Sequence, residues 1–183
     1  QPGLKSLLAE GIYNIGLDNC PASFDAWIEL AEKESAKNSR RAVEDFESLY
    51  VGGAWPSIAV VMPVYNPRPE HLRAALDSVL AQEDPHWQLC VADDASTNSE
   101  IPEILREYAA QDGRMRLTLR EQNGHISRAS NTALELSEAP WTGFLDHDDL
   151  LPPHALREVA ARVRQNPGLV LVYSDEDKIA ARG

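Results

Sequence analysis

The sequence predicts an α/β fold: a mostly parallel, doubly wound sheet over residues 55–183, with a helical extension over residues 1–54. Two observations lead to this prediction. After Pro56, short apolar runs alternate with stretches whose apolar residues recur every three or four positions, as strands and helices do when they alternate along a chain. The glycines at 52–53 separate this alternating pattern from the preceding residues, in which apolar side chains recur at helical spacing only.

The first 54 residues carry apolar side chains at helical spacing, which predicts amphipathic helices. These residues are Leu4, Leu7, Leu8, Phe24, Trp27, Ile28, Ala31, Val43, Phe46 and Tyr50. A stripe of this kind is typical of a packing face rather than of a ligand site. We therefore expect a helical extension that contributes packing.

The remaining elements follow in order. Strands are expected at residues 57–62, 87–92, 115–119, 141–146 and 169–173. Helices are expected around residues 72–80, 101–108, 127–137 and 156–163. The strands are short continuous apolar runs bounded by turn residues, which favours a sheet buried on both faces with right-handed crossovers.

Composition limits the function. The 183 residues suffice for one domain, and their net charge of −12 argues against a protein that binds nucleic-acid phosphates. No apolar run approaches the roughly 20 residues that a membrane helix needs. Cys20 and Cys90 form neither a disulfide framework nor a zinc motif, which favours a reducing, cytoplasmic location.

Polar residues follow directly after the predicted strands. They are Tyr65 and Asn66, Asp93 and Asp94, Asp146 and Asp148, and the segment 175–178. Ligands of doubly wound sheets bind at the carboxyl ends of strands, so these residues are the candidate site. No glycine-rich dinucleotide or P-loop motif is present, which disfavours those enzyme classes.

The run FLDHDD (144–149) supplies three carboxylates. In an extended backbone Asp146 and Asp148 share one face, while Asp149 points away toward the next helix. Paired carboxylates suit Mg²⁺ or Mn²⁺ that also holds substrate phosphates. The alternative is that Asp149 caps the following helix and the other two are solvated turn residues.

Five motifs in order resemble the amino-terminal half of family 2 glycosyltransferases. They are PVYN (63–66), SVLAQ (78–82), VADDAST (91–97), NGHISRASN (123–131) and FLDHDD (144–149). The resemblance covers residues 56–183, about two-thirds of the chain, and implies a Rossmann-like sheet of the GT-A type. More loosely, YSDEDK (173–178) and FDAWI (24–28) are similar to bacterial members that build surface polysaccharide.

The resemblance implies a metal-dependent, inverting transfer of a sugar to a glycan acceptor. It implies a donor site for a UDP- or dTDP-type nucleotide-sugar. The nucleotide-binding candidates are Pro63, Tyr65, Asn66, Asp93, Asp94, Arg128 and Asp146. Tyr65 would pack on the base and Asp94 would accept a hydrogen bond from it. Asp148 would bind the metal directly, and Asp146 would face the ribose or a metal-bound water.

The chain departs from the family pattern in one motif. His125 and Ser130 stand where family members often have a glycine and an arginine, so Arg128 or Lys178 would have to contact phosphate instead. The resemblance places the catalytic base beyond Gly183 and matches Asp175, Glu176 and Asp177 to the segment before it. We therefore expect a truncated domain that binds the donor and transfers little, taken from a longer protein that associates peripherally with a membrane.

Two other functions share some of these features. A sugar nucleotidyltransferase also has a parallel sheet, a metal and acids, but it opens with a glycine-rich basic loop where this chain has PVYN. A phosphoacceptor receiver domain has its acidic pair after the first strand, whereas Asp93 and Asp94 follow the second. A nucleotide-binding module without catalysis is a third alternative.

Overall fold

The computed structural model describes residues 55–174. Contacts within the chain divide it into two units, Gln1–Ala54 and Trp55–Gly183. The helical extension predicted for residues 1–54 lies outside the described residues. The fold described below belongs to the second unit.

Four parallel strands form the sheet in the order β3-β2-β1-β4. They are β1 (Ile58–Val64), β2 (Trp87–Asp93), β3 (Met115–Leu119) and β4 (Trp141–Phe144). The helices that connect and follow them are α3 (Pro69–Leu80), α4 (Glu100–Gln111), α5 (His125–Leu134) and α6 (Ala155–Gln165). The predicted α/β class and mostly parallel sheet are thus confirmed.

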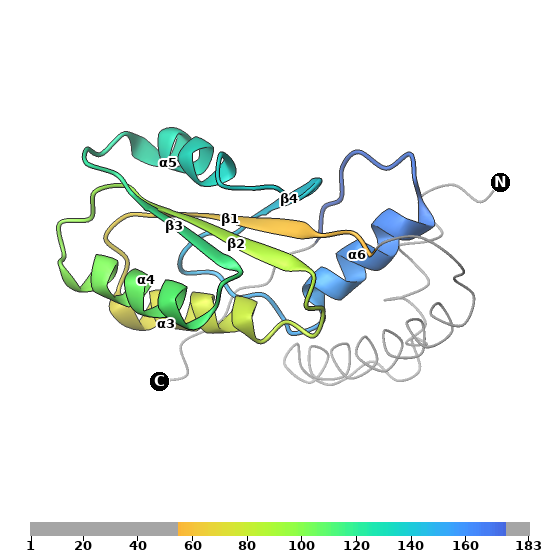
Figure 1. Cartoon of the computed structure of the whole chain (residues 1–183), viewed down its shortest axis with the longest axis horizontal. Helices are drawn as coiled ribbons and strands as arrows, with labels where there is room; N and C mark the ends of the chain where they lie inside the picture. Colours follow the sequence, from red (N-terminus) through yellow and green to blue (C-terminus); the bar gives the residue numbers. More distant parts are fainter. Residues whose placement is uncertain (1–54, 175–183) are drawn as a thin grey trace, which may run out of the picture. The chain divides into compact units, whose positions relative to one another are not determined.

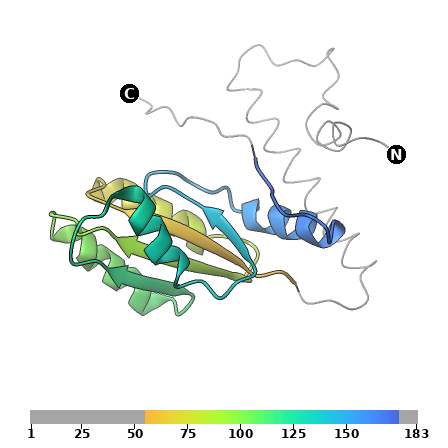
Figure 2. The same ribbon diagram turned by 90° about the horizontal axis from the view of Figure 1, so that it is seen from above.

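Helices cover both faces of the sheet, because α3 and α4 lie on one face and α5 on the other (Figure 1). Seen from above, α5 lies over β1 and β2 (Figure 2). Every residue of β1 is buried, which agrees with its nearly uninterrupted apolar sequence. No helix within residues 55–174 is both long and apolar enough to cross a bilayer.

The two faces of the sheet differ in side-chain size. Large side chains such as Met62, Leu89 and Leu72 fill the core under α3, α4 and α6. Small ones, including Ala59 and Cys90, form the second cluster beneath α5. Burial raises the pKa of the Cys90 thiol, so this cysteine behaves as a small neutral core residue.

The strand predicted at residues 169–173 is absent from the structure. Val170 is 90% exposed and Tyr173 is 73% exposed, and the segment pairs with no strand of the described sheet. A strand exists only where a neighbour satisfies its backbone groups, and an apolar run alone does not supply that neighbour. This prediction is therefore wrong for the described part of the chain.

Candidate functional site

A pocket of about 400 Å³ opens where β1 and β4 separate. β4 pairs with β1 only from Ile58 to Val61, so the last residues of β1 have no β4 neighbour. In the sheet, β2 and β3 lie on one side of β1 and β4 lies on the other. The order of the strands therefore reverses at β1, which makes this crevice the topological switch point of the sheet. The pocket is lined by Pro63, Val64, Tyr65, Asp94, Asn123, His125, Ile126, Ala129, Asp146, His147 and Asp148.

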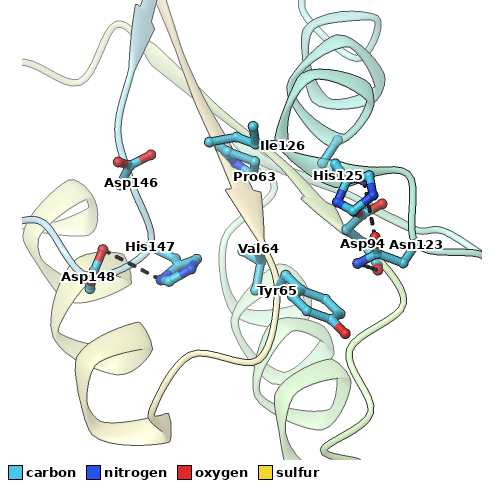
Figure 3. A pocket seen from close by; sticks show the side chains of 11 residues that line it. Pro63, Val64, Tyr65, Asp94, Asn123, His125, Ile126, Asp146, His147 and Asp148 are labelled. Carbon is cyan, nitrogen blue, oxygen red and sulfur yellow. Dashed lines mark hydrogen bonds and ion pairs between the residues drawn. The ribbon is translucent and has the colours of Figure 1, made fainter.

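The pocket has two chemically distinct ends (Figure 3). Tyr65, Asp94 and His125 lie at one end, and Asp146, His147 and Asp148 lie at the other. Tyr65 is 45% exposed, so its aromatic ring remains accessible. One end therefore offers an aromatic ring beside a carboxylate, and the other offers two carboxylates with an imidazole between them in the sequence.

Asp94 is held by three segments of the chain. Its side chain is 2% exposed, and Oδ1 accepts a hydrogen bond from Nη1 of Arg120 at 2.6 Å. The Gly124 N–H lies 3.0 Å from both carboxylate oxygens, and Asn123 donates to the Asp94 carbonyl at 3.2 Å. This buried charge is consequently paired and fixed in orientation.

Glycine at 124 leaves room for the close approach of Arg120. A β-carbon at this position would lie 2.6 Å from Nη2 of Arg120 and 2.8 Å from Cδ of Arg128. Any larger residue would push the guanidinium away from Asp94. The turn after β3 is thus adapted to bring its N–H and its arginine to one carboxylate.

Asn66 and Asp93 hold the loops behind the pocket instead of lining it. Asn66 Oδ1 accepts hydrogen bonds from the N–H groups of Thr97 and Asn98, at 2.8 and 3.2 Å. Asp93 is 3% exposed and binds the hydroxyl and the N–H of Ser96. These contacts join the loop after β1 to the loop after β2.

The acidic end is built differently from the prediction. β4 ends at Phe144, and residues 146–149 form a turn in which the Asp149 N–H donates to the Asp146 carbonyl at 3.1 Å. Asp146 and Asp148 therefore line the same pocket through a turn and not through an extended strand. Asp149 is not the cap of α6, whose N-cap is His154.

The end of α3 holds the segment that follows this turn. Gln82, 7% exposed, donates to the Pro152 carbonyl at 2.8 Å and accepts from the Leu156 N–H at 3.0 Å. Ser78 Oγ accepts from the Leu151 N–H at 3.2 Å. The serine and glutamine of the SVLAQ motif thus anchor the chain between the acidic turn and α6.

The structure brings together five predicted site residues: Pro63, Tyr65, Asp94, Asp146 and Asp148. Asn66, Asp93 and Arg128 do not line the pocket. Lys178 and the acids at 175–177 lie outside the described residues. The binding roles predicted for all of these residues, inside and outside the pocket, stay predictions.

Sequence reasoning missed Arg120 and several lining residues, among them Asn123, His125 and His147. His147 Nδ1 is 3.7 Å from Asp148 Oδ1. The NGH turn after the third strand was visible in the sequence, but its contact with Asp94 joins positions about 30 residues apart. Arg120 had no signal of its own, because a lone arginine after a strand is usually solvated.

The sequence of this chain is similar to a known family and to several known proteins. The family model described as "Glycosyl transferase family 2" matches residues 59–178. Protein y4gI of Sinorhizobium fredii is 49% identical over 128 residues, which are 70% of this chain and 14% of y4gI. The O-antigen biosynthesis protein RfbC of Myxococcus xanthus is 35% identical over 164 residues, which are 90% of this chain and 12% of RfbC.

A solved structure, TarS of Staphylococcus aureus, shares this architecture. Its fragment 1–349 superposes with a TM-score of 0.56 at 25% identity, covering 61% of this chain and 33% of the fragment. That fragment has also been solved with UDP and with UDP-GlcNAc. The chain spans a small part of the length of each of these proteins.

Proposed function

The chain belongs to glycosyl transferase family 2, and on this premise we propose that its pocket binds the nucleoside diphosphate of a sugar donor. The observation that carries the proposal is the two-ended pocket, with an aromatic ring and a carboxylate at one end and two exposed carboxylates at the other. Family membership favours this function over the nucleotidyltransferase and receiver alternatives.

The base of the nucleotide occupies the Tyr65 end in this proposal. An exposed aromatic ring suits stacking on a base. The fixed carboxylate of Asp94 suits an N–H on the edge of that base, because such a group donates a hydrogen bond and uracil or thymine carries one. UDP is the first ligand to test, because the similar TarS fragment has been solved with UDP.

The diphosphate occupies the acidic end, which requires a divalent cation. Carboxylate oxygens fit Mg²⁺ or Mn²⁺, and both Asp146 and Asp148 are exposed in the pocket. Within residues 55–174 no group of three acids, histidines or cysteines would hold a metal alone. Asp146 and Asp148 would therefore hold the ion jointly with phosphate oxygens, so that nucleotide and metal bind together.

We infer that this site serves the inverting transfer of a sugar to a glycan acceptor, which agrees with the O-antigen role in the name of RfbC. The cation would neutralise charge on the departing diphosphate. The acceptor hydroxyl also needs a carboxylate base. Of the carboxylates that line the pocket, Asp94 is bound to Arg120 and the two turn acids would serve the diphosphate, so none of the three is left to act as this base.

Calorimetric titration with UDP tests the proposal. We expect binding with Mn²⁺, strong weakening in EDTA, and loss of the metal dependence in Asp148→Asn. Glu103→Gln is the matched control, since it removes one charge from an exposed position on α4. Equal UDP affinity with Mn²⁺ and in EDTA would contradict the assignment of the acidic end.

A further inference from the structure

Three non-glycine residues among those described have positive φ: Asn66 at 48°, Ala95 at 60° and His125 at 64°. A β-carbon is strained in this left-handed region, where glycine is the residue of lowest cost. Asn66 tolerates it, because asparagine visits this region more readily than most residues and its amide binds the loop 96–98. Histidine also visits this region more readily than most residues, but the His125 side chain makes no hydrogen bond within residues 55–174 that would explain its place there.

The backbone around His125 is fixed from several sides. The His125 N–H donates to Asn123 Oδ1 at 3.2 Å, and Gly124 is bound to Asp94. These contacts maintain the strained conformation whatever side chain stands at 125. The histidine is therefore not needed to form the turn.

The imidazole, in contrast, is placed for contact with a ligand. His125 is exposed and lines the pocket, at the same end as Tyr65 and Asp94 (Figure 3). Within residues 55–174 its ring has no hydrogen-bond partner. A strained residue that presents an unoccupied aromatic ring to a pocket points to a role in binding.

We propose that His125 is a further donor-binding residue, whose imidazole contacts the nucleobase together with the Tyr65 ring. The proposal rests on the function proposed above. A base has two faces and an edge; Tyr65 offers a surface for one face, Asp94 an acceptor for the edge, and His125 a surface for the other face. Glycine at 125 would keep the turn and lose this contact.

The test uses substitutions whose effects on stability and on binding have opposite signs. His125→Gly relieves the strain, so the Tm should rise by roughly 2–4 °C. The same change removes the ring, so the Kd for UDP with Mn²⁺ should rise at least about five-fold, the lower part of the range for a stacked base. Ala95→Gly is the matched control: its φ is similar, and Ala95 does not line the pocket. It should raise the Tm and leave the Kd unchanged.

Two further measurements locate the effect. His125→Phe keeps a ring and should retain most of the affinity, whereas His125→Asn tolerates the backbone and should bind as weakly as the glycine variant. Pyrophosphate with Mn²⁺ reports on the acidic end alone, so its affinity should be the same in all variants. Equal weakening of pyrophosphate binding would show that His125 does not act on the base.

The outcomes distinguish this inference from the proposed function. If His125→Gly binds UDP as the wild type does, or if His125→Phe loses as much as His125→Gly, the contact with the base is refuted while the donor site stands. If the wild-type chain binds no nucleoside diphosphate with Mn²⁺, the proposed function fails and this inference fails with it.

Discussion

Replacing Arg120 with methionine should destabilise the fold strongly, because it leaves the Asp94 carboxylate buried without its cation. The Arg120 and Asp94 side chains are 18% and 2% exposed, and their closest atoms are 2.6 Å apart. Removing one partner of a buried pair costs about 3–5 kcal/mol. The Gly124 N–H still donates to both oxygens, which places the expected loss at about 2–3 kcal/mol.

Urea denaturation followed by circular dichroism would measure this loss. A decrease of that size corresponds to a Tm lower by roughly 4–12 °C for a chain of this length. The double variant Arg120→Met/Asp94→Asn should be more stable than Arg120→Met alone, since a neutral amide leaves no unpaired charge. A double variant no more stable than the single one would show that lost packing, and not the buried charge, causes the effect.

Arg73→Met is the matched control. It removes the same group from an ion pair with Glu107 in which both side chains are about half exposed, at 41% and 52%. Exposed pairs contribute little, so its denaturation midpoint should stay close to that of the wild type. If Arg120→Met is no more destabilising than this control, the reasoning about Asp94 is refuted.

Three other predictions concern the base end, the anchor of the acidic turn and acid stability. Tyr65→Ala should weaken UDP binding by about 1–3 kcal/mol in calorimetry while Tyr65→Phe binds normally; equal affinities would move the base elsewhere. Gln82→Leu should lower the free energy of unfolding by about 1–3 kcal/mol, because the Pro152 carbonyl and a helix N–H lose their partner, and an unchanged urea midpoint would count against this anchor. Hydrogen bonding to Arg114 lowers the pKa of Asp112. The contribution of this ion pair to the free energy of unfolding is therefore complete above about pH 4 and is lost as the pH falls further. Comparing urea midpoints at pH 7 and pH 3 should show a smaller change in Asp112→Asn than in the wild type, and equal changes would exclude this pair as a source of acid sensitivity.

The family and the local elements were readable from the sequence. The five motifs pointed to family 2 glycosyltransferases, and the family model confirms that membership. Four predicted strands and the helices that connect or follow them are present, because the spacing of apolar residues reflects which face of an element is buried. Their boundaries shift by a few residues, as at Phe144, where β4 ends two residues before the predicted position.

The pocket was partly readable for a similar reason. Tyr65, Asp94, Asp146 and Asp148 each follow a strand closely, and the carboxyl ends of parallel strands meet at one edge. The sequence does not reveal which neighbouring polar residues face the ligand and which hold the loops. Asn66 and Asp93 are polar and lie at the ends of strands, as the lining residues do, yet their side chains bind the loop at 96–98.

The sequence by itself determined the class, the order of the elements and the edge of the sheet where the acids collect, because these depend on periodicity within short stretches. Only the tertiary structure decided that residues 169–173 form no strand, that the acids stand on a turn held by Gln82, and that Arg120 pairs with Asp94. Each of these depends on a partner at a distance along the chain: a neighbouring strand, a carbonyl 70 residues away, or a carboxylate 26 residues away. Local patterns carry no information about such partners. Water forms hydrogen bonds with the same polar groups equally well until the fold brings the partner to them.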